Sequence, residues 1–397
     1  MPVSPEMTRE RKIQWLVLFI LTGFVASVIY HYVMGAYVGE GFPKNTFLFT
    51  PKARFSDFLA VYQAKSSVYF PFGNLVVALF CAIEPVKLAF GLFMLLGLVF
   101  VAVYFWINLR VKSRVDTFLN VLVFAGCSFP VLFLFDRANF ELICFVFVAL
   151  SVFFFARRSF MVSGILLSAA VGMKLFPIVF LVLFLSEKRY KEAATSVLAS
   201  LVLTVASVAF LSHGDIVGYL RSYLETLHYY QSNYVVGNDG LDFGNSLFGA
   251  LKVLFFEGAN SHLEKLLLPY LVFASVAFVL LSLYVITIEK QLWKKVTLMV
   301  IALCLLPYVS ADYKLVYLFA PLFLLINTKS DSENSRSIRG EGFASRIFIV
   351  LFGLLLLPKN YRPFVDVYDG VYLDPFLMSL LALLIVGCGV VGAVKRG

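Results

Sequence analysis

A succession of long apolar runs constrains this chain more than any other feature. The first run covers residues 13–34, and a bilayer core needs about 20 such residues per helix. Hydrophobic residues make up 61% of the chain and charged residues 14%, which is far more apolar than a soluble domain. The later runs cover residues 86–109, 115–134, 139–156, 159–173, 175–186, 193–212, 266–288, 295–310, 315–327, 342–357 and 375–394. The sequence therefore predicts one polytopic, all-α membrane domain over residues 1–397, with about 12 transmembrane helices, some of them short.

The distribution of basic residues predicts how the domain is oriented. Most of the 33 lysines and arginines fall in short loops on one face, which the positive-inside rule places in the cytoplasm together with both termini. The Ser-rich, charged segment 327–342 on that face has the composition of a flexible linker. A first outer loop, 35–85, and a long outer loop, 213–265, then lie on the extracytoplasmic face. Three short turns, 135–141, 172–177 and 307–314, lie there as well.

The first outer loop contains an amphipathic segment that starts at Ser56. At helical spacing Phe55, Phe58 and Tyr62 share one face, and Asp57 lies on the other. We expect a helix along the membrane surface with its aromatic face among the lipid headgroups. Asp57 is equally consistent with a first-turn acid favoured by the helix dipole and with a general base. The apolar piece that follows, 71–83, predicts a re-entrant or surface element.

Lys174 is the most informative single charge. It lies between two apolar runs, and a lysine at membrane depth is costly unless it is paired, so it is a functional candidate; the alternative is a surface turn lysine. Other polar residues on the same face allow a similar choice between a ligand and an ordinary surface or interfacial role. They are Arg54, Lys65, Asp136, Arg137, Asn139, Glu141, His228, Asn245, Asp312, Tyr313 and Lys314.

Cofactor signals are weak in this sequence. The four histidines are scattered, the five cysteines lie singly in apolar runs, and no glycine-rich phosphate loop is present. We expect no cofactor and no nucleic-acid partner, although outer acids are suitable oxygen ligands for a divalent cation. The chain shows no clear internal repeat, which disfavours a transporter or flippase of lipid-linked sugars, the main alternative to an enzyme.

An ordered set of short motifs resembles a known family. The motifs are F-x-D-F-x-x-x-Y-x-A from Phe55, Y-F-P-F from Tyr69, A-N-F-E from Ala138, G-M-K-x-F-P from Gly172 and N-S-L-F-G from Asn245. Their order is similar to that of the integral-membrane glycosyltransferases of family 87 in the GT-C superfamily. These resemble the polyprenyl-phosphate-mannose-dependent α-mannosyltransferases. The turn D-R-A-N replaces the G-Q-x-N often found in relatives, so only Asn139 carries over there.

The resemblance implies a function and a set of roles. It implies inverting transfer of a hexose, most simply mannose, or of a pentose from a polyprenyl-phosphate donor to a lipid or glycan acceptor, in cell-envelope glycan synthesis. The reaction would take place at the extracytoplasmic face of a cytoplasmic (inner) membrane. Asp57 would act as general base, and Lys174, Lys314 and Arg137 would bind the donor phosphate. Substrate contacts would come from Arg54, Lys65, Asp136, Asn139, His228, Asn245, Asp312 and Tyr313.

Overall fold

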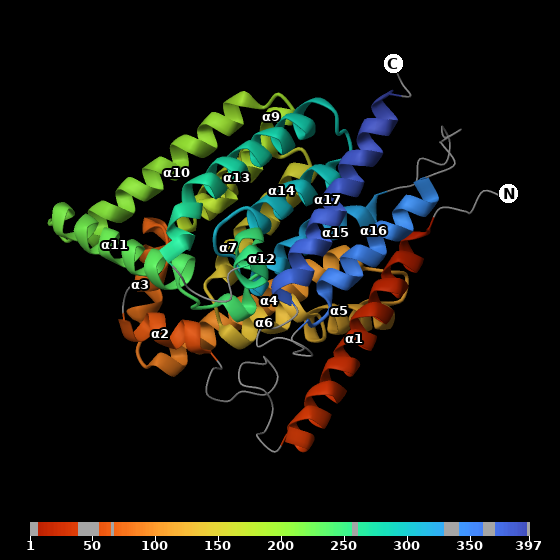
Figure 1. The fold of residues 1–397 in the computed structure, drawn as a ribbon, viewed down its shortest axis with the longest axis horizontal. Coiled ribbons are helices and arrows are strands. Elements are labelled where there is room, and N and C mark those ends of the chain that lie inside the picture. Colours follow the sequence, from red (N-terminus) through yellow and green to blue (C-terminus); the bar gives the residue numbers. More distant parts are fainter. Residues whose placement is uncertain are drawn as a thin grey trace.

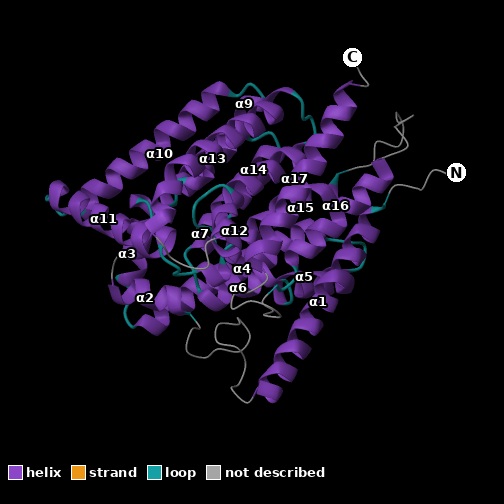
Figure 2. Ribbon diagram, in the orientation of Figure 1, coloured by secondary structure: helices purple, strands orange, loops and turns teal. Residues whose placement is uncertain are grey.

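A computed structural model describes residues 7–38, 55–64, 67–255, 261–328, 341–359 and 370–394. Within these ranges the fold is helical and contains no strand, apart from an isolated antiparallel bridge between Gly244 and Ala311 (Figure 2). The all-α prediction is confirmed for this part of the chain. The N-terminal end of α1 and the C-terminal end of α17 lie at one end of the bundle, away from α2 and α3 (Figure 1).

The described chain forms seventeen α-helices and four shorter helical segments. The α-helices are α1 (Arg9–Val38), α2 (Ser56–Ala64), α3 (Pro71–Cys81), α4 (Val86–Leu109), α5 (Arg114–Gly126), α6 (Phe129–Arg137), α7 (Glu141–Ala156), α8 (Phe160–Met173), α9 (Leu181–Ser186), α10 (Tyr190–Leu211), α11 (Ile216–Tyr230), α12 (Leu247–Phe255), α13 (Ser261–Thr287), α14 (Leu292–Leu305), α15 (Phe319–Asn327), α16 (Glu341–Leu356) and α17 (Gly370–Val394). The shorter segments are η1 (Phe176–Phe180), η2 (Gln231–Val236), η3 (Leu241–Phe243) and η4 (Asp312–Leu318).

Five of the described helices are long and apolar enough to cross a membrane. They lie in α1, α4, α10, α13 and α17, and a sixth span results if α5 and α6 count as one. Five shorter apolar helices, of 10–17 residues, accompany them. The chain is therefore an integral membrane protein, while the predicted number of about 12 spans is not confirmed. The shorter helices need neighbouring helices to cover their ends, because exposed backbone groups are costly in lipid.

The apolar run predicted over residues 115–134 is not one straight helix. It is divided into α5 and α6, which meet at an angle of 58°. Pro130 lies in the first turn of α6, where a missing backbone N–H costs nothing. In the interior of one continuous helix its ring would clash with the preceding turn, so α5 ends before it. The break turns α6 toward α2, and the backbone N–H of Phe55 donates to the carbonyl of Asp136 at 2.6 Å.

Helix α2 starts at Ser56 as predicted, but its aromatic face does not lie among lipid headgroups. Phe58 is fully buried and stacks on Phe140, with ring centroids 5.7 Å apart. It also contacts Phe80 of α3 and Phe93 of α4. The expectation was wrong because these aromatic side chains from distant segments supply an apolar surface inside the protein. Because Asp57 immediately precedes Phe58, burial of this ring also fixes the position of Asp57.

A second contact attaches α3 to the end of α8. The backbone N–H of Phe70 donates to the carbonyl of Met173 at 3.0 Å. At Gly73 a side chain would not fit, because a Cβ atom would lie 2.7 Å from the same carbonyl. This close approach brings the segment before α3 directly beside Lys174. It also makes 71–83 a short helix, α3, packed on α8 rather than a span of its own.

Candidate active site

Asp57 lies in the first turn of α2 and both of its carboxylate oxygens have partners. Oδ1 accepts a hydrogen bond from the Arg137 guanidinium at 2.6 Å, and Oδ2 accepts one from the Asn139 amide at 2.7 Å. The side chains of Asp57 and Arg137 remain 18% and 26% exposed. The Ser56 hydroxyl also donates to Oδ1, at 3.4 Å. A carboxylate has about four acceptor positions, so one remains for another ligand. Asp57 is thus rigidly oriented and still reachable.

The turn between α6 and α7 brings Asn139 to this carboxylate. Ala138 adopts φ 48°, a left-handed conformation that is unfavourable for a residue with a Cβ and reverses the chain after Arg137. The Asn139 Oδ1 then accepts the backbone N–H of Glu141 at 2.8 Å, as capping side chains do at helix starts. One turn therefore orients Arg137 and Asn139 toward Asp57 and Glu141 toward the interior.

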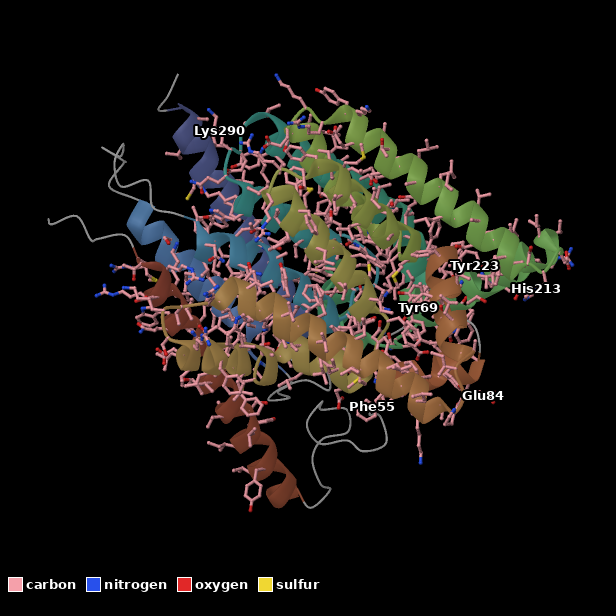
Figure 3. All side chains as sticks on the ribbon, turned by 180° about the vertical axis from the view of Figure 1, so that it is seen from behind. Phe55, Tyr69, Glu84, His213, Tyr223 and Lys290 are labelled. Atoms are coloured by element: carbon pink, nitrogen blue, oxygen red, sulfur yellow. The ribbon has the colours of Figure 1, made fainter. Side chains whose placement is uncertain are left out.

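Tyr69 links the Asp57 carboxylate to Lys174. Its hydroxyl donates to Asn139 Oδ1 at 3.2 Å, and the Lys174 ammonium lies 4.6 Å from the centre of its ring. Burial raises the pKa of the Tyr69 hydroxyl far above its usual range, so the group remains a proton donor. Figure 3 shows Tyr69 at the same end of the molecule as Phe55 and Glu84, with Lys290 at the opposite end.

Lys174 forms an ion pair with Glu141, whose side chain is only 2% exposed. The second oxygen of Glu141 accepts a hydrogen bond from the Tyr317 hydroxyl. Lys314, also buried, interacts electrostatically with Glu141 and places its ammonium 4.7 Å from the Phe176 ring centre. Two lysines thus surround one carboxylate. Burial lowers the pKa of the Lys314 ammonium, and Glu141 acts in the opposite direction.

The surroundings of Lys174 keep it charged. Burial by itself lowers the pKa of its ammonium, but Glu141, Tyr313 and Tyr69 outweigh this effect and raise the pKa well above the ordinary lysine value. The Tyr313 ring centre lies 5.8 Å from the same ammonium. Lys174 is therefore a permanent cation at the end of α8, and the interpretation as an isolated surface lysine does not describe it.

The remaining candidate residues are placed differently. Asn245 is buried and joins two loops, because its amide donates to the Ala311 carbonyl at 3.2 Å. Asp312 is buried in a separate group, where it interacts electrostatically with Asp374 and Lys359.

The side chains of two other predicted residues, His228 and Asp136, are not among the contacts that join Asp57 to Lys174. His228 is exposed near the end of α11, and Asp136 contributes its backbone carbonyl to the start of α2. Arg54 and Lys65 lie outside the described residues. No group of three or more His, Cys, Asp or Glu side chains that could hold a metal occurs in the described ranges.

Two central residues have no role in the sequence analysis: Glu141 appears there only as one polar residue of a turn, and Tyr69 only as part of a motif. Glu141 was grouped with the neighbouring turn, and an exposed self-paired turn was the alternative interpretation. A usable signal was present, since α7 and α8 have similar lengths and a short connection. Antiparallel helices of this kind bring the first residue of one, Glu141, beside the end of the other, Lys174.

Replacing Tyr69 separates the two contacts that this side chain makes. Tyr69→Phe removes the hydrogen bond to Asn139 but keeps the ring beside Lys174, so we expect a loss of about 0.5–1.5 kcal/mol in stability. Tyr69→Leu also removes the ring and should lower the unfolding midpoint further. Thermal unfolding of the purified variants in detergent measures both. Equal midpoints for the two variants would show that the ring contact with Lys174 contributes nothing.

The fold and the site together define an integral membrane protein with a charged, preorganised polar site at the ends of its helices. The sequence profile of glycosyltransferase family 87 matches residues 68–310, more than half of the chain. The chain belongs to glycosyltransferase family 87 and is a glycosyltransferase, an enzyme rather than the transporter considered from its sequence. No curated protein and no solved structure matches it significantly.

Proposed function

We propose that this glycosyltransferase transfers a sugar from a polyprenyl-phosphate donor to a hydroxyl of a lipid or glycan acceptor, with inversion at the anomeric carbon. The observation that carries the proposal is the continuous set of contacts from Asp57 through Asn139 and Tyr69 to Lys174. These contacts bring a reachable carboxylate and a group of lysines to one side of the protein. Such a transfer requires a general base, which the carboxylate provides, and stabilisation of the leaving phosphate, which the lysines provide.

Asp57 is the general base in this proposal. Its free lone pair takes the proton of the acceptor hydroxyl while the acceptor oxygen forms a bond to the anomeric carbon. The bond from that carbon to the phosphate oxygen breaks, and the phosphate leaves with the electron pair. Arg137 and Asn139 act as positioning residues, since they hold the carboxylate at fixed distances of 2.6 and 2.7 Å. In this proposal Arg137 therefore positions the base, Asp57, and does not bind the donor phosphate.

Lys174 and Lys314 stabilise the departing phosphate. Lys174 forms an ion pair with Glu141, and Lys314 interacts electrostatically with both of them. Burial lowers the pKa of the Lys314 ammonium, and an incoming phosphate would favour its charged form. Ammonium groups at the ends of membrane helices are suitable partners for a lipid phosphate, whose isoprenoid tail stays in the bilayer. The extracytoplasmic face is the expected side, because the short basic loops belong to the other end of the bundle.

Two tyrosines are suitable for holding the sugar. Tyr230 and Tyr234 stack with ring centres 5.0 Å apart at the junction of α11 and η2. Tyr230 interacts electrostatically with Lys174, and Tyr234 does so with Asp57. Aromatic rings in the neighbourhood of the base and the cation offer an apolar face to a hexose. We assign mannose as the first donor sugar to test.

A transfer assay tests the function directly. Purified protein in lipid nanodiscs is mixed with radiolabelled polyprenyl-phosphate mannose, glucose or a pentose and with a membrane lipid extract as acceptor. The expected result is a labelled product whose sugar has the inverted anomeric configuration. Transfer from a nucleotide sugar in the absence of any polyprenyl phosphate, or a product with retained configuration, would overturn the proposal.

A further inference from the structure

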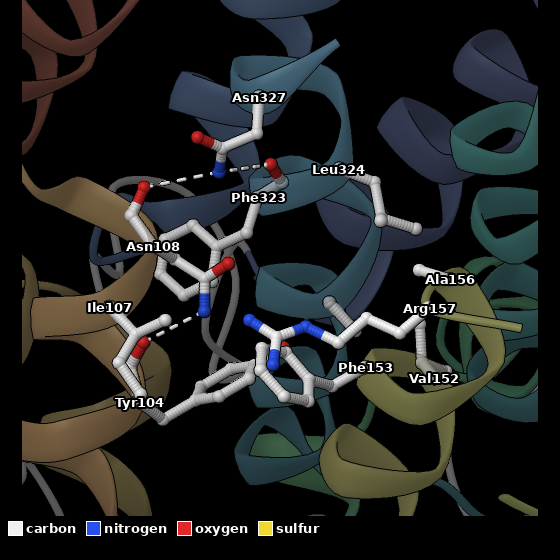
Figure 4. Close-up of a pocket in the computed structure, with 11 residues that line it drawn as sticks. Tyr104, Ile107, Asn108, Val152, Phe153, Ala156, Arg157, Phe323, Leu324 and Asn327 are labelled. Atoms are coloured by element: carbon white, nitrogen blue, oxygen red, sulfur yellow. Dashed lines mark hydrogen bonds between the residues drawn. The ribbon is translucent and has the colours of Figure 1, made fainter. Parts of the chain in front are cut away.

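A cavity of about 290 Å³ lies between the ends of α4, α7 and α15 (Figure 4). Its walls are apolar and include Tyr104, Val152 and Phe323, while Asn108, Arg157 and Asn327 form a polar rim. The cavity is separate from the Asp57 site. Glu141 starts α7 in that site and Arg157 follows the last residue of α7, which places them about 24 Å apart along the helix at 1.5 Å per residue.

The rim of the cavity carries a positive charge. Arg157 is exposed, its guanidinium lies 4.0 Å from the ring centre of Phe153, and no acidic residue lines the cavity. No ion pair between Arg157 and a carboxylate occurs in the described part of the chain. The ring orients the guanidinium without neutralising it. An anionic ligand therefore has a preorganised partner here.

The rest of the rim is held in place by hydrogen bonds. Asn327 donates through its amide to the carbonyls of Asn108 and Phe323, at 3.1 and 2.8 Å. Arg9 of α1 donates to Asn327 Oδ1 at 2.8 Å and to the Asn108 carbonyl at 2.9 Å. These bonds join the ends of α4 and α15 to the start of α1. The cavity is thus a built feature of the bundle and not a gap between loose ends.

One edge of the cavity continues into an exposed apolar surface on α4. Val99, Val103 and Ile107 follow one another at four-residue spacing on α4, are 54%, 53% and 47% exposed, and lie on one helix face. Ile107 also lines the cavity. Because α4 is long and apolar enough to cross a membrane, this face is suited to contact with acyl chains. A ligand in the cavity can extend an apolar chain along it.

We infer that the cavity binds an anionic membrane phospholipid. Its head-group phosphate lies against Arg157 and the Asn108 amide, and an acyl chain follows the Val99, Val103 and Ile107 surface. A free phosphate would use only the rim and leave the apolar walls without a partner, so the lipid is the occupant that fits both parts. The site is separate from catalysis and binds a lipid that is neither donor nor acceptor.

Native mass spectrometry of the full chain in detergent, titrated with phosphatidylglycerol or with phosphatidylcholine of the same acyl chains, tests this inference. We expect Arg157→Gln to weaken phosphatidylglycerol binding about fivefold, which is the effect of one basic residue near an anionic lipid, and to leave phosphatidylcholine binding unchanged. Arg158→Gln is the matched control, since Arg158 is a neighbouring exposed arginine that does not line the cavity.

Two further arms make the result decisive. Ala156→Trp keeps the charge but fills the cavity from an exposed position, so it should weaken the same lipid as strongly as Arg157→Gln does. Inorganic phosphate and glycerol 3-phosphate should not displace the lipid at millimolar concentration. Equal losses in Arg157→Gln and Arg158→Gln, no loss in Ala156→Trp, or displacement by free phosphate would each overturn the inference.

Discussion

Asp57→Asn is expected to lower sugar transfer by about 10²- to 10⁴-fold, which is the contribution of a positioned general base. The asparagine side chain has nearly the same shape and cannot take the acceptor proton. The loss should appear in kcat, with the apparent affinity for the polyprenyl-phosphate donor nearly unchanged. Steady-state transfer kinetics in nanodiscs, together with the unfolding midpoint of the variant, measure the two effects separately.

A positioning variant distinguishes the base from a merely structural acid. Asn139→Ala removes the hydrogen bond to Oδ2 of Asp57 but leaves the carboxylate itself, so its loss of kcat should be clearly smaller than that of Asp57→Asn. Asp116→Asn, in the first turn of α5, is a control for a helix-start acid without such contacts. Near-normal transfer by a folded Asp57→Asn variant would remove Asp57 from the base role.

The position of Asp57 could be predicted from sequence, but the surroundings of its helix could not. Local spacing and the Ser56-Asp57 pair at the start of an amphipathic segment are sufficient to predict α2. The burial of Phe58 depends on Phe93 and Phe140, which lie far along the chain. A periodic pattern identifies which residues share a face. It does not identify what covers that face, and lipid and protein interior are equally apolar.

The break between α5 and α6 shows a second limit. The apolar run around residues 115–134 has the length and composition of a span, and Pro130 alone allowed either a kink or a new helix. The choice follows from tertiary contacts, because α6 must reach α2 for the Asp136 carbonyl to accept the Phe55 N–H. Helix count in a membrane chain therefore cannot be read from apolar runs alone when several are shorter than about 20 residues.

Partnerships between charges were the least predictable part of the site. Sequence analysis identified Lys174 as a cation that needs a partner, which is confirmed by its ion pair with Glu141. It did not identify the partner, since Glu141 looked like one member of a turn cluster with Asp136 and Arg137. The turn separates them physically: the left-handed Ala138 sends Arg137 to Asp57 and Glu141 to Lys174.

Glu141→Gln is expected to be the most destabilising single change in the site, by about 3–5 kcal/mol, because it leaves buried cations without their counter-charge. Lys174 and Lys314 would both face a neutral amide. Lys174→Met should cost less, since Lys314 remains as a partner for the carboxylate. The double variant Glu141→Gln/Lys174→Met should be more stable than Glu141→Gln alone, and chemical or thermal unfolding in detergent measures all three.

Glu141→Gln also tests whether the lysines around Glu141 bind the donor phosphate. If Lys174 and Lys314 bind the donor phosphate, that phosphate can supply the negative charge that Glu141→Gln has lost. Polyprenyl phosphate should then raise the unfolding midpoint of Glu141→Gln more than that of the original protein, and it should have little effect on Glu141→Gln/Lys174→Met. A polyprenol without phosphate is the control. Equal stabilisation of all three proteins by polyprenyl phosphate would show that the lysines hold the fold together without binding the donor.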